Sequence, residues 1–245
     1  MKIAILSDVH GNHVALQAAL GHARAADASQ LVVLGDMVGY YYWAKDVLQQ
    51  LRAWPLVAIR GNHERMFAES LDDPASAARF HTRYGSALIV AEQILSSDDK
   101  AWLLGLPDRA TASFDGVMLE LCHGSPRDPD EYVYPDATLD ALDACVVPDR
   151  DFVLMGHTHR PMIVPRGGMV LINPGSVGQA RDIGGLACWC LLDTTTRVIQ
   201  FQRTPYDASS VVAEARRRDP HLPNLADVLL RAAPHAAPDA LPAAS

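Results

Sequence analysis

Near its N-terminus the chain reads Ile3-Ala4-Ile5-Leu6-Ser7-Asp8-Val9-His10-Gly11-Asn12. The four apolar residues predict a short buried strand, and the polar residues after them predict a loop at the carboxyl end of that strand. The next segment, 12–25, is rich in alanine and leucine and starts with an asparagine that can cap a helix. A strand followed by a helix is the first half of a βαβ unit.

The alternation of strands and helices continues along the chain. Apolar segments at 31–34 and 56–59 predict two more strands, with an amphipathic helix between them at 44–51. This order is typical of a parallel sheet in an α/β protein. Later segments predict two strands, two antiparallel hairpins and two helices, at 117–122, 152–155, 162–172, 186–202, 136–145 and 209–217.

The composition is that of a folded protein. The chain has 245 residues, of which 49% are hydrophobic and 20% are charged. We assign a single domain to residues 1–230, and we expect the Ala/Pro-rich residues 231–245 to be a disordered tail. Within the domain, residues 64–107 predict helices near the mouth of a site.

Charge and hydropathy exclude several functional classes. The net charge of −8 argues against stable binding to nucleic acid. No apolar run reaches the roughly 18 residues of a membrane span, so no membrane partner is expected. Neither a secretory signal nor a disulfide scaffold is indicated, which favours the cytoplasm.

Five predicted strands each end in a polar cluster. In open α/β sheets, ligands bind in the crevice beyond the carboxyl ends of the strands. The side chains in these clusters are carboxylates, imidazoles and one amide, which are groups that bind metal ions. The seven candidate ligands are Asp8, His10, Asp36, Asn62, His123, His157 and His159.

The number of candidate ligands decides how many metal ions to expect. A tetrahedral zinc ion needs about four protein ligands, so seven are too many for one ion. Two ions about 3.5–4 Å apart that share a carboxylate would use all seven. We therefore expect two divalent transition-metal ions, with manganese first and iron or zinc as alternatives. Such a pair generates hydroxide and stabilises an in-line phosphoryl displacement.

The five motifs together identify a family resemblance. Asp-x-His, Gly-Asp, Gly-Asn-His-Glu, His-Gly and Gly-His-x-His occur in this order, and they resemble the calcineurin-like metallophosphoesterase family from about Lys2 to Arg203. The resemblance implies an α/β fold with a two-layer mixed β core flanked by helices, a four-layer sandwich. It also implies a dinuclear site at the carboxyl ends of the strands.

The resemblance further implies a role for each motif residue. Asp8, His10 and His159 would hold one metal ion. Asn62, His123 and His157 would hold the other, and Asp36 would bridge the two. His63 would not be a ligand but would protonate the leaving oxygen or stabilise its charge.

Two longer segments resemble the small bacterial phosphodiesterase branch of this family. They read Gly156-His157-Thr158-His159-Arg160-Pro161 and Asn173-Pro174-Gly175-Ser176-Val177-Gly178. The segment 60–64 also resembles protein serine/threonine phosphatases, but the Asp-Arg-Gly that those enzymes carry after Gly-Asp is absent. We take Arg60, Tyr40 and Arg181 as candidate substrate contacts. For the aromatic cluster 40–43 we favour packing in the core, ahead of a place in the wall of the substrate site or on a partner surface.

The leading hypothesis is a metal-dependent phosphodiesterase that acts by in-line attack of a metal-bound hydroxide on a small phosphate ester. A nucleotide is one candidate substrate. The first alternative is a phosphomonoesterase, either similar to protein phosphatases or acting on dinucleoside polyphosphates. The second is a non-catalytic scaffold with the same fold. A homo-oligomer is left open.

Overall fold

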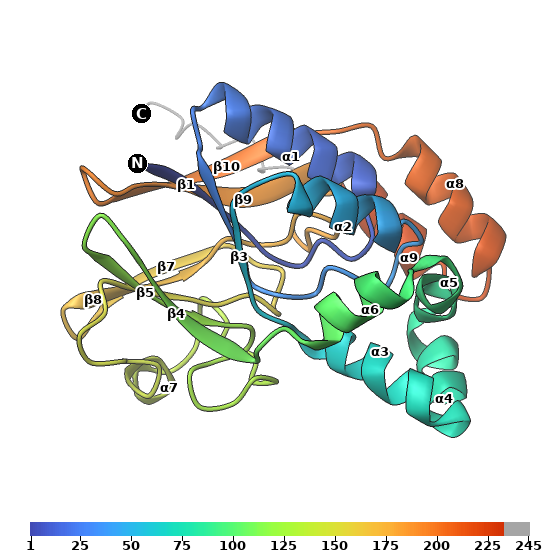
Figure 1. Cartoon of the computed structure of the whole chain (residues 1–245). Coiled ribbons are helices and arrows are strands. Elements are labelled where there is room, and N and C mark those ends of the chain that lie inside the picture. The colour runs from blue at the N-terminus through green and yellow to red at the C-terminus, as the bar shows by residue number, and fades with distance from the viewer. Residues whose placement is uncertain (233–245) are drawn as a thin grey trace, which may run out of the picture.

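Two five-stranded β-sheets pack face to face and form the centre of the molecule (Figure 1). The computed structural model describes residues 1–232. The first sheet has the strand order β10-β9-β1-β2-β3, with β1, β2 and β3 parallel and β9 antiparallel to both of its neighbours. Its strands are β1 (Lys2–Leu6), β2 (Gln30–Val33), β3 (Leu56–Ala58), β9 (Leu186–Asp193) and β10 (Val198–Pro205).

The second sheet has the order β4-β5-β6-β8-β7. Its three inner strands are parallel, and the two edge strands are antiparallel to their neighbours. Its strands are β4 (Arg109–Phe114), β5 (Val117–Cys122), β6 (Phe152–Leu154), β7 (Met162–Arg166) and β8 (Met169–Asn173). Both sheets are mixed, which confirms the predicted fold class.

Side-chain alternation along β1 explains the layering. Ile3 and Ile5 lie in the apolar core between the two sheets, whereas Ala4 and Leu6 lie in a second core on the opposite face of the first sheet. Successive residues of a strand point to opposite faces, so a fully apolar strand needs cover on both. Helices provide that cover: α1 (His13–Ala25) and α2 (Ala44–Arg52) (Figure 1).

A short helix, α7 (Leu139–Asp143), covers the outer face of the second sheet. It is shorter than the predicted 136–145, because the Thr138 hydroxyl caps it by accepting the Ala141 N–H at 3.3 Å. The molecule therefore has four layers: helices, sheet, sheet and helix.

Further helices gather at one end of the sheets (Figure 1). The segment between β3 and β4 contains α3 (Asn62–Asp72), α4 (Pro74–Tyr84), α5 (Ala87–Ile94) and α6 (Ser97–Leu104). The strand that follows, β4, was not predicted. Its residues alternate between exposed and half-buried because it is an edge strand, so its apolar signal is weak.

The C-terminal part packs against the aromatic cluster 40–43. It contains α8 (Ser209–Arg218), α9 (Asn224–Asp227) and a 3₁₀ turn at Val228–Leu230. Of the tail predicted to be disordered, residues 233–245 lie outside the described residues. At its start, the Arg231 carbonyl accepts the Gly184 N–H at 2.8 Å. No helix within residues 1–232 is long and apolar enough to cross a membrane.

Candidate metal centre

The seven predicted ligands converge at the carboxyl ends of strands from both sheets. Two follow β1, one follows β2, one opens α3 after β3, one follows β5 and two follow β6. All are buried except Asn62, which is half-buried. They form two neighbouring clusters. The first consists of Asp8, His10 and His159, and the second of Asp36, Asn62, His123 and His157.

In the first cluster, side-chain nitrogen and oxygen atoms face one another closely. The Oδ1 atom of Asp8 lies 3.3 Å from Nε2 of His159 and 3.8 Å from Nε2 of His10. The two Nε2 atoms are 3.0 Å apart. The Oδ1 atom of Asp8 is buried and has no hydrogen-bond partner within residues 1–232. An unpartnered buried carboxylate oxygen is costly unless a cation or a donor satisfies it.

The hydrogen bonds of the two imidazoles show that a cation fits between them. Nδ1 of His10 lies 3.2 Å from the Val38 carbonyl oxygen, and Nδ1 of His159 lies 2.8 Å from that of Gln179. A carbonyl oxygen only accepts, so each Nδ1 carries the hydrogen and each Nε2 presents a lone pair. Burial lowers the pKa of His10 well below its usual value, which keeps this imidazole neutral. Two facing lone pairs repel each other, and a metal ion would accept both.

The second cluster also contains an imidazole that is held by a backbone carbonyl group. Nδ1 of His123 lies 2.7 Å from the Leu34 carbonyl oxygen and donates to it, so Nε2 is the ring atom that faces the other ligands. That Nε2 faces Oδ1 of Asn62 at 3.0 Å and Oδ2 of Asp36 at 3.4 Å, which are both acceptors. Nε2 of His157 is buried without a hydrogen-bond partner in the described chain. A second cation would satisfy all four groups.

Asp36 lies between the two clusters. Its Oδ2 atom is 3.6 Å from Nε2 of His10 and 3.4 Å from Nε2 of His123. Burial raises the pKa of Asp36, but His123 and His63 more than offset this and hold it well below its usual value. Asp36 is therefore ionised, and one of its oxygens is placed to serve both clusters.

Metal binding at neutral pH should release about one proton per chain, because a metal ligand must be deprotonated. Burial lowers the pKa of His123, but Asp36 and Asp8 more than offset this and raise it to about 9. Burial lowers the pKa of His157 to about 4. At pH 7.5 the metal-free protein thus holds a proton on His123 and none on His157. Calorimetric titration with Mn²⁺ in buffers of different ionisation enthalpy counts the released protons, and a heat independent of the buffer would contradict the expectation.

The ligands are brought together by tight backbone turns. Extended backbone would also place side chains at i and i+2 on one side, but the ligand loops do not use it. Five ligands have left-handed backbone with φ between 51° and 67°: Asp8, His10, Asp36, His157 and His159. Non-glycine residues adopt this conformation only at a cost, and such residues concentrate at functional sites.

Glu64 holds the backbone of the ligand loops in place. It was not identified as a site residue from the sequence alone. It is fully buried, and its carboxylate accepts the backbone N–H groups of Asp36, Met37, Val38 and Gly61 at 2.7–3.2 Å. Burial, followed by the nearby Asp36, raises the pKa of Glu64 to about 7. These bonds tie the Asp36 loop to the start of α3. Its place three residues after the N-cap, a capping-box position, is the sequence signal that could have identified it.

Replacing Glu64 by Gln should lower the free energy of unfolding by about 2–4 kcal/mol, because the amide nitrogen would face N–H donors that it cannot accept from. Urea unfolding at pH 8 measures the change. The control is Glu69→Gln in the same helix, which removes an exposed ion pair with Arg79 and should change stability much less than Glu64→Gln does. Equal effects of the two substitutions would contradict the assigned role of Glu64.

His63 lies beside the first cluster and is almost completely buried. Its ring centroid is 4.7 Å from that of His10, 4.7 Å from that of Tyr40 and 5.5 Å from that of Tyr84. Its Nδ1 atom has no hydrogen-bond partner in the described residues, and burial lowers its pKa. The ring fits only because residue 39 is glycine, with φ of +90°. A Cβ atom there would lie 2.0 Å from Nδ1 of His63.

The aromatic cluster 40–43 divides between the site and the core. Tyr40 contacts the His10 ring at a centroid distance of 4.6 Å, so it lies at the centre. Tyr41 and Tyr42 are buried in the core beneath the C-terminal helices. Trp43 packs against His13, with ring centroids 4.7 Å apart. Core packing therefore describes two of the four residues.

The two arginines predicted to contact substrate have different surroundings. Nε and Nη2 of Arg60 donate to the two carboxylate oxygens of Asp108 at 2.7 and 2.8 Å, so this guanidinium is already engaged. Arg181 instead lines a surface cavity together with Tyr40. A phosphate contact by either arginine stays a prediction.

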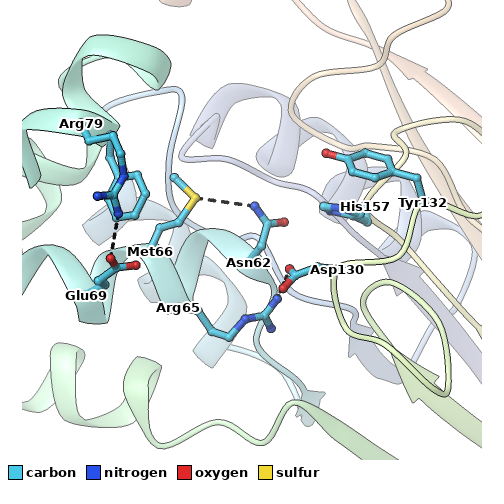
Figure 2. A pocket seen from close by; sticks show the side chains of 9 residues that line it. Asn62, Arg65, Met66, Glu69, Arg79, Asp130, Tyr132 and His157 are labelled. Carbon is cyan, nitrogen blue, oxygen red and sulfur yellow. Dashed lines mark hydrogen bonds and ion pairs between the residues drawn. The ribbon is translucent and has the colours of Figure 1, made fainter. Parts of the chain in front are cut away.

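A cavity of about 460 Å³ opens next to the second cluster (Figure 2). Asn62 and His157 line it, and the Tyr132 ring lies over that of His157 at a centroid distance of 3.9 Å. Helices α3 and α4 and the loop after β5 complete its wall with Arg65, Met66, Glu69, Arg79, Phe80 and Asp130. Sequence reasoning missed Tyr132, although two tyrosines in the loop after His123 were a visible signal.

Solved structures of similar proteins have the same fold. A metallophosphoesterase from Sphaerobacter thermophilus is 29% identical, with a TM-score of 0.75, and the match covers 94% of this chain and 98% of that one. Among curated proteins, Uncharacterized protein MJ0912 of Methanocaldococcus jannaschii is 28% identical over 84% of this chain and 88% of its own length. Phosphodiesterase YfcE of Escherichia coli is 26% identical over 79% of this chain and 88% of its own length.

The family assignment rests on most of the chain. Residues 1–197 match the model of the calcineurin-like phosphoesterase superfamily domain. This family uses divalent metal ions, and the Asp and His groups described above can bind them. The resemblance found in the five motifs is thus confirmed, and the chain belongs to the calcineurin-like phosphoesterase superfamily.

Proposed function

We propose that this protein is a phosphodiesterase that hydrolyses a small phosphate ester at a dinuclear metal centre. The observation that carries the proposal is the position of Asp36. One of its oxygens lies within 3.6 Å of imidazole nitrogens in two separate clusters. A single cation would leave one of those clusters unsatisfied. The similarity to Phosphodiesterase YfcE supports the same reaction class.

Each ligand has an assigned place in this proposal. Asp8, His10 and His159 would hold one metal ion, Asn62, His123 and His157 would hold the other, and Asp36 would serve both. When bound, the ions supply positive charge to phosphoryl oxygens and lower the pKa of a coordinated water. The carbonyl groups that accept from the imidazole Nδ1 atoms fix the ring orientations in advance, so binding needs little rearrangement.

His63 assists the oxygen that leaves phosphorus by donating a hydrogen bond from its neutral ring. Its Nδ1 atom has no partner among the described residues and lies in a site walled by Tyr40 and Tyr84. These rings exclude water, which strengthens a hydrogen bond from the imidazole to a developing alkoxide.

The surroundings favour a diester over a monoester. A diester has two organic arms, and cavities open on both sides of the centre. One lies beside Asn62 and His157, and the other lies beside Tyr40 and Arg181. A monoester would use only one of them.

The test combines metal content with two chromogenic substrates. We expect two metal ions per chain after purification without chelator. With Mn²⁺, kcat/KM for bis-p-nitrophenyl phosphate should exceed that for p-nitrophenyl phosphate by about tenfold, a difference of about 1.4 kcal/mol. The reverse preference would favour the phosphomonoesterase alternative. Two bound metal ions without turnover of either ester would favour the scaffold alternative.

A further inference from the structure

Two arginines line two cavities near the centre. Arg160 and Arg181 both contribute to a cavity of about 690 Å³ near Tyr134 and to one of about 430 Å³ near Tyr40. Both residues therefore lie where two neighbouring cavities meet the protein. The reaction proposed above gives neither guanidinium group a role in the chemical step.

The chain holds these arginines close to the centre. Arg160 directly follows His159. The backbone N–H of Arg181 lies 3.5 Å from the His159 carbonyl oxygen, and the carbonyl of Gln179, two residues earlier, accepts from Nδ1 of His159 at 2.8 Å. Tyr40 forms the boundary between the cavity and the centre, since its ring lies 4.7 Å from that of His63 on the other side. A substrate at His63 would reach the arginines across a single aromatic ring.

The lack of an ion pair within residues 1–232 distinguishes these two arginines from the others near the centre. Arg60 and Arg65 pair with Asp108, Arg65 also pairs with Asp130, and Arg79 pairs with Glu69. Within residues 1–232, neither Arg160 nor Arg181 has a carboxylate within 4.0 Å. Asp136 and Asp227 line the same cavities but do not pair with them. In a chain with a net charge of −8, two unpaired guanidinium groups beside the centre are available for an anionic ligand.

We propose that Arg160 and Arg181 form an anion subsite that binds a second phosphoryl group of the substrate. The inference rests on the proposed function and deepens it. The substrate is then a phosphodiester with an additional phosphate on one arm. Guanidinium groups suit this ligand because their planar donors match phosphate oxygens in a bidentate geometry.

The cavity on the other side of the centre suits the second, uncharged arm. Its two arginines are neutralised by ion pairs, as Figure 2 shows for Arg79 with Glu69 and Arg65 with Asp130. The exposed ring of Tyr132 offers a surface on which an aromatic group can stack. The two sides of the centre therefore differ in charge, and a substrate with one charged arm would bind in one orientation.

Two substrates that differ by one phosphate test the proposal. Both are p-nitrophenyl esters of thymidine 5′-phosphate, and the second also carries a 3′-phosphate. We expect the extra phosphate to lower KM by about tenfold in the unmodified protein, with little change in kcat. The Arg160→Gln/Arg181→Gln double variant should lose this preference. Arg181→Lys keeps the positive charge but loses the paired planar N–H donors of the guanidinium group, so this variant should retain part of the preference for the second phosphate.

The control is Arg216→Gln, which removes an exposed charge from α8 without touching either cavity and should keep the preference. Equal KM values for the two substrates in the unmodified protein would overturn the proposal. A preference that survives in the double variant would also overturn it.

A binding measurement separates failure of the subsite from failure of the proposed function. Calorimetry with thymidine 3′,5′-diphosphate needs no turnover. If neither ester is hydrolysed but the double variant binds this probe about tenfold more weakly than the unmodified protein, the subsite stands and the phosphodiesterase proposal fails. If the two proteins bind the probe equally, the subsite is ruled out whatever the turnover.

Discussion

Replacing Asp36 by Asn should remove both metal ions and lower kcat by at least about 10³-fold, because both clusters lose their only shared anionic ligand. Oδ2 of Asp36 lies 3.6 Å from Nε2 of His10 and 3.4 Å from Nε2 of His123. Its Oδ1 atom accepts a hydrogen bond from the backbone N–H of His63 at 2.8 Å. An asparagine cannot satisfy all three groups. Its single oxygen could accept from the N–H or face the imidazoles, but not both, and the negative charge would be gone.

Metal content after gel filtration and turnover of bis-p-nitrophenyl phosphate measure this effect. Asp219→Asn is the matched control. Asp219 is a buried carboxylate far from the ligands in sequence, and it accepts from Ser86 and from the Tyr42 hydroxyl. That variant should be less stable but keep its metal content. If Asp36→Asn lost stability and retained both ions, the shared-ligand role would be wrong.

His63→Ala should keep both metal ions and lower kcat by about 10²-fold or more, which is the usual size of general acid catalysis. The ring lies at the edge of the first cluster, and its Nδ1 atom has no partner in the part of the chain described. The imidazole is therefore free to serve the leaving oxygen. Because the loss arises from a poor leaving group, an ester of a more acidic alcohol should be affected less.

His13→Ala is the control for that variant. His13 lies just after the first motif but packs against Trp43 and lines a different cavity, so its loss should change kcat by less than about twofold. His63 also lies within 4.8 Å of ligand atoms of His10 and Asp36. A His63→Ala protein without metal would show that His63 is a ligand and would overturn the assigned acid role.

Local sequence patterns predicted most of the strands and helices of the fold. The apolar run of β1, the capped helix after it and the next two strands appear where the sequence placed them, within one or two residues. The strands β1 and β2 are buried on both faces, so their apolar runs are strong signals. The edge strand β4 was missed because one of its faces meets solvent and supplies little apolar signal.

The sequence identified the candidate metal ligands but not the residues that surround them and hold them in place. Metal-ligand side chains at five strand ends were recognisable because each motif is local. Glu64 and Tyr132 were not recognised, since each acts through contacts that a local pattern does not show. The Glu64 carboxylate accepts N–H groups from a loop 26–28 residues earlier in the chain.

Sequence alone determined the order of strands and helices, the family resemblance and the set of candidate ligands, because these depend on residue type and short-range spacing. Only the tertiary structure decided that Asp36 lies between two clusters, that the imidazole lone pairs face each other, and that Arg160 and Arg181 stand unpaired while Arg60 does not. The reason is physical. Each of these facts depends on how two separate sheets are placed against each other, and no local periodicity encodes the distance between groups that packing brings together.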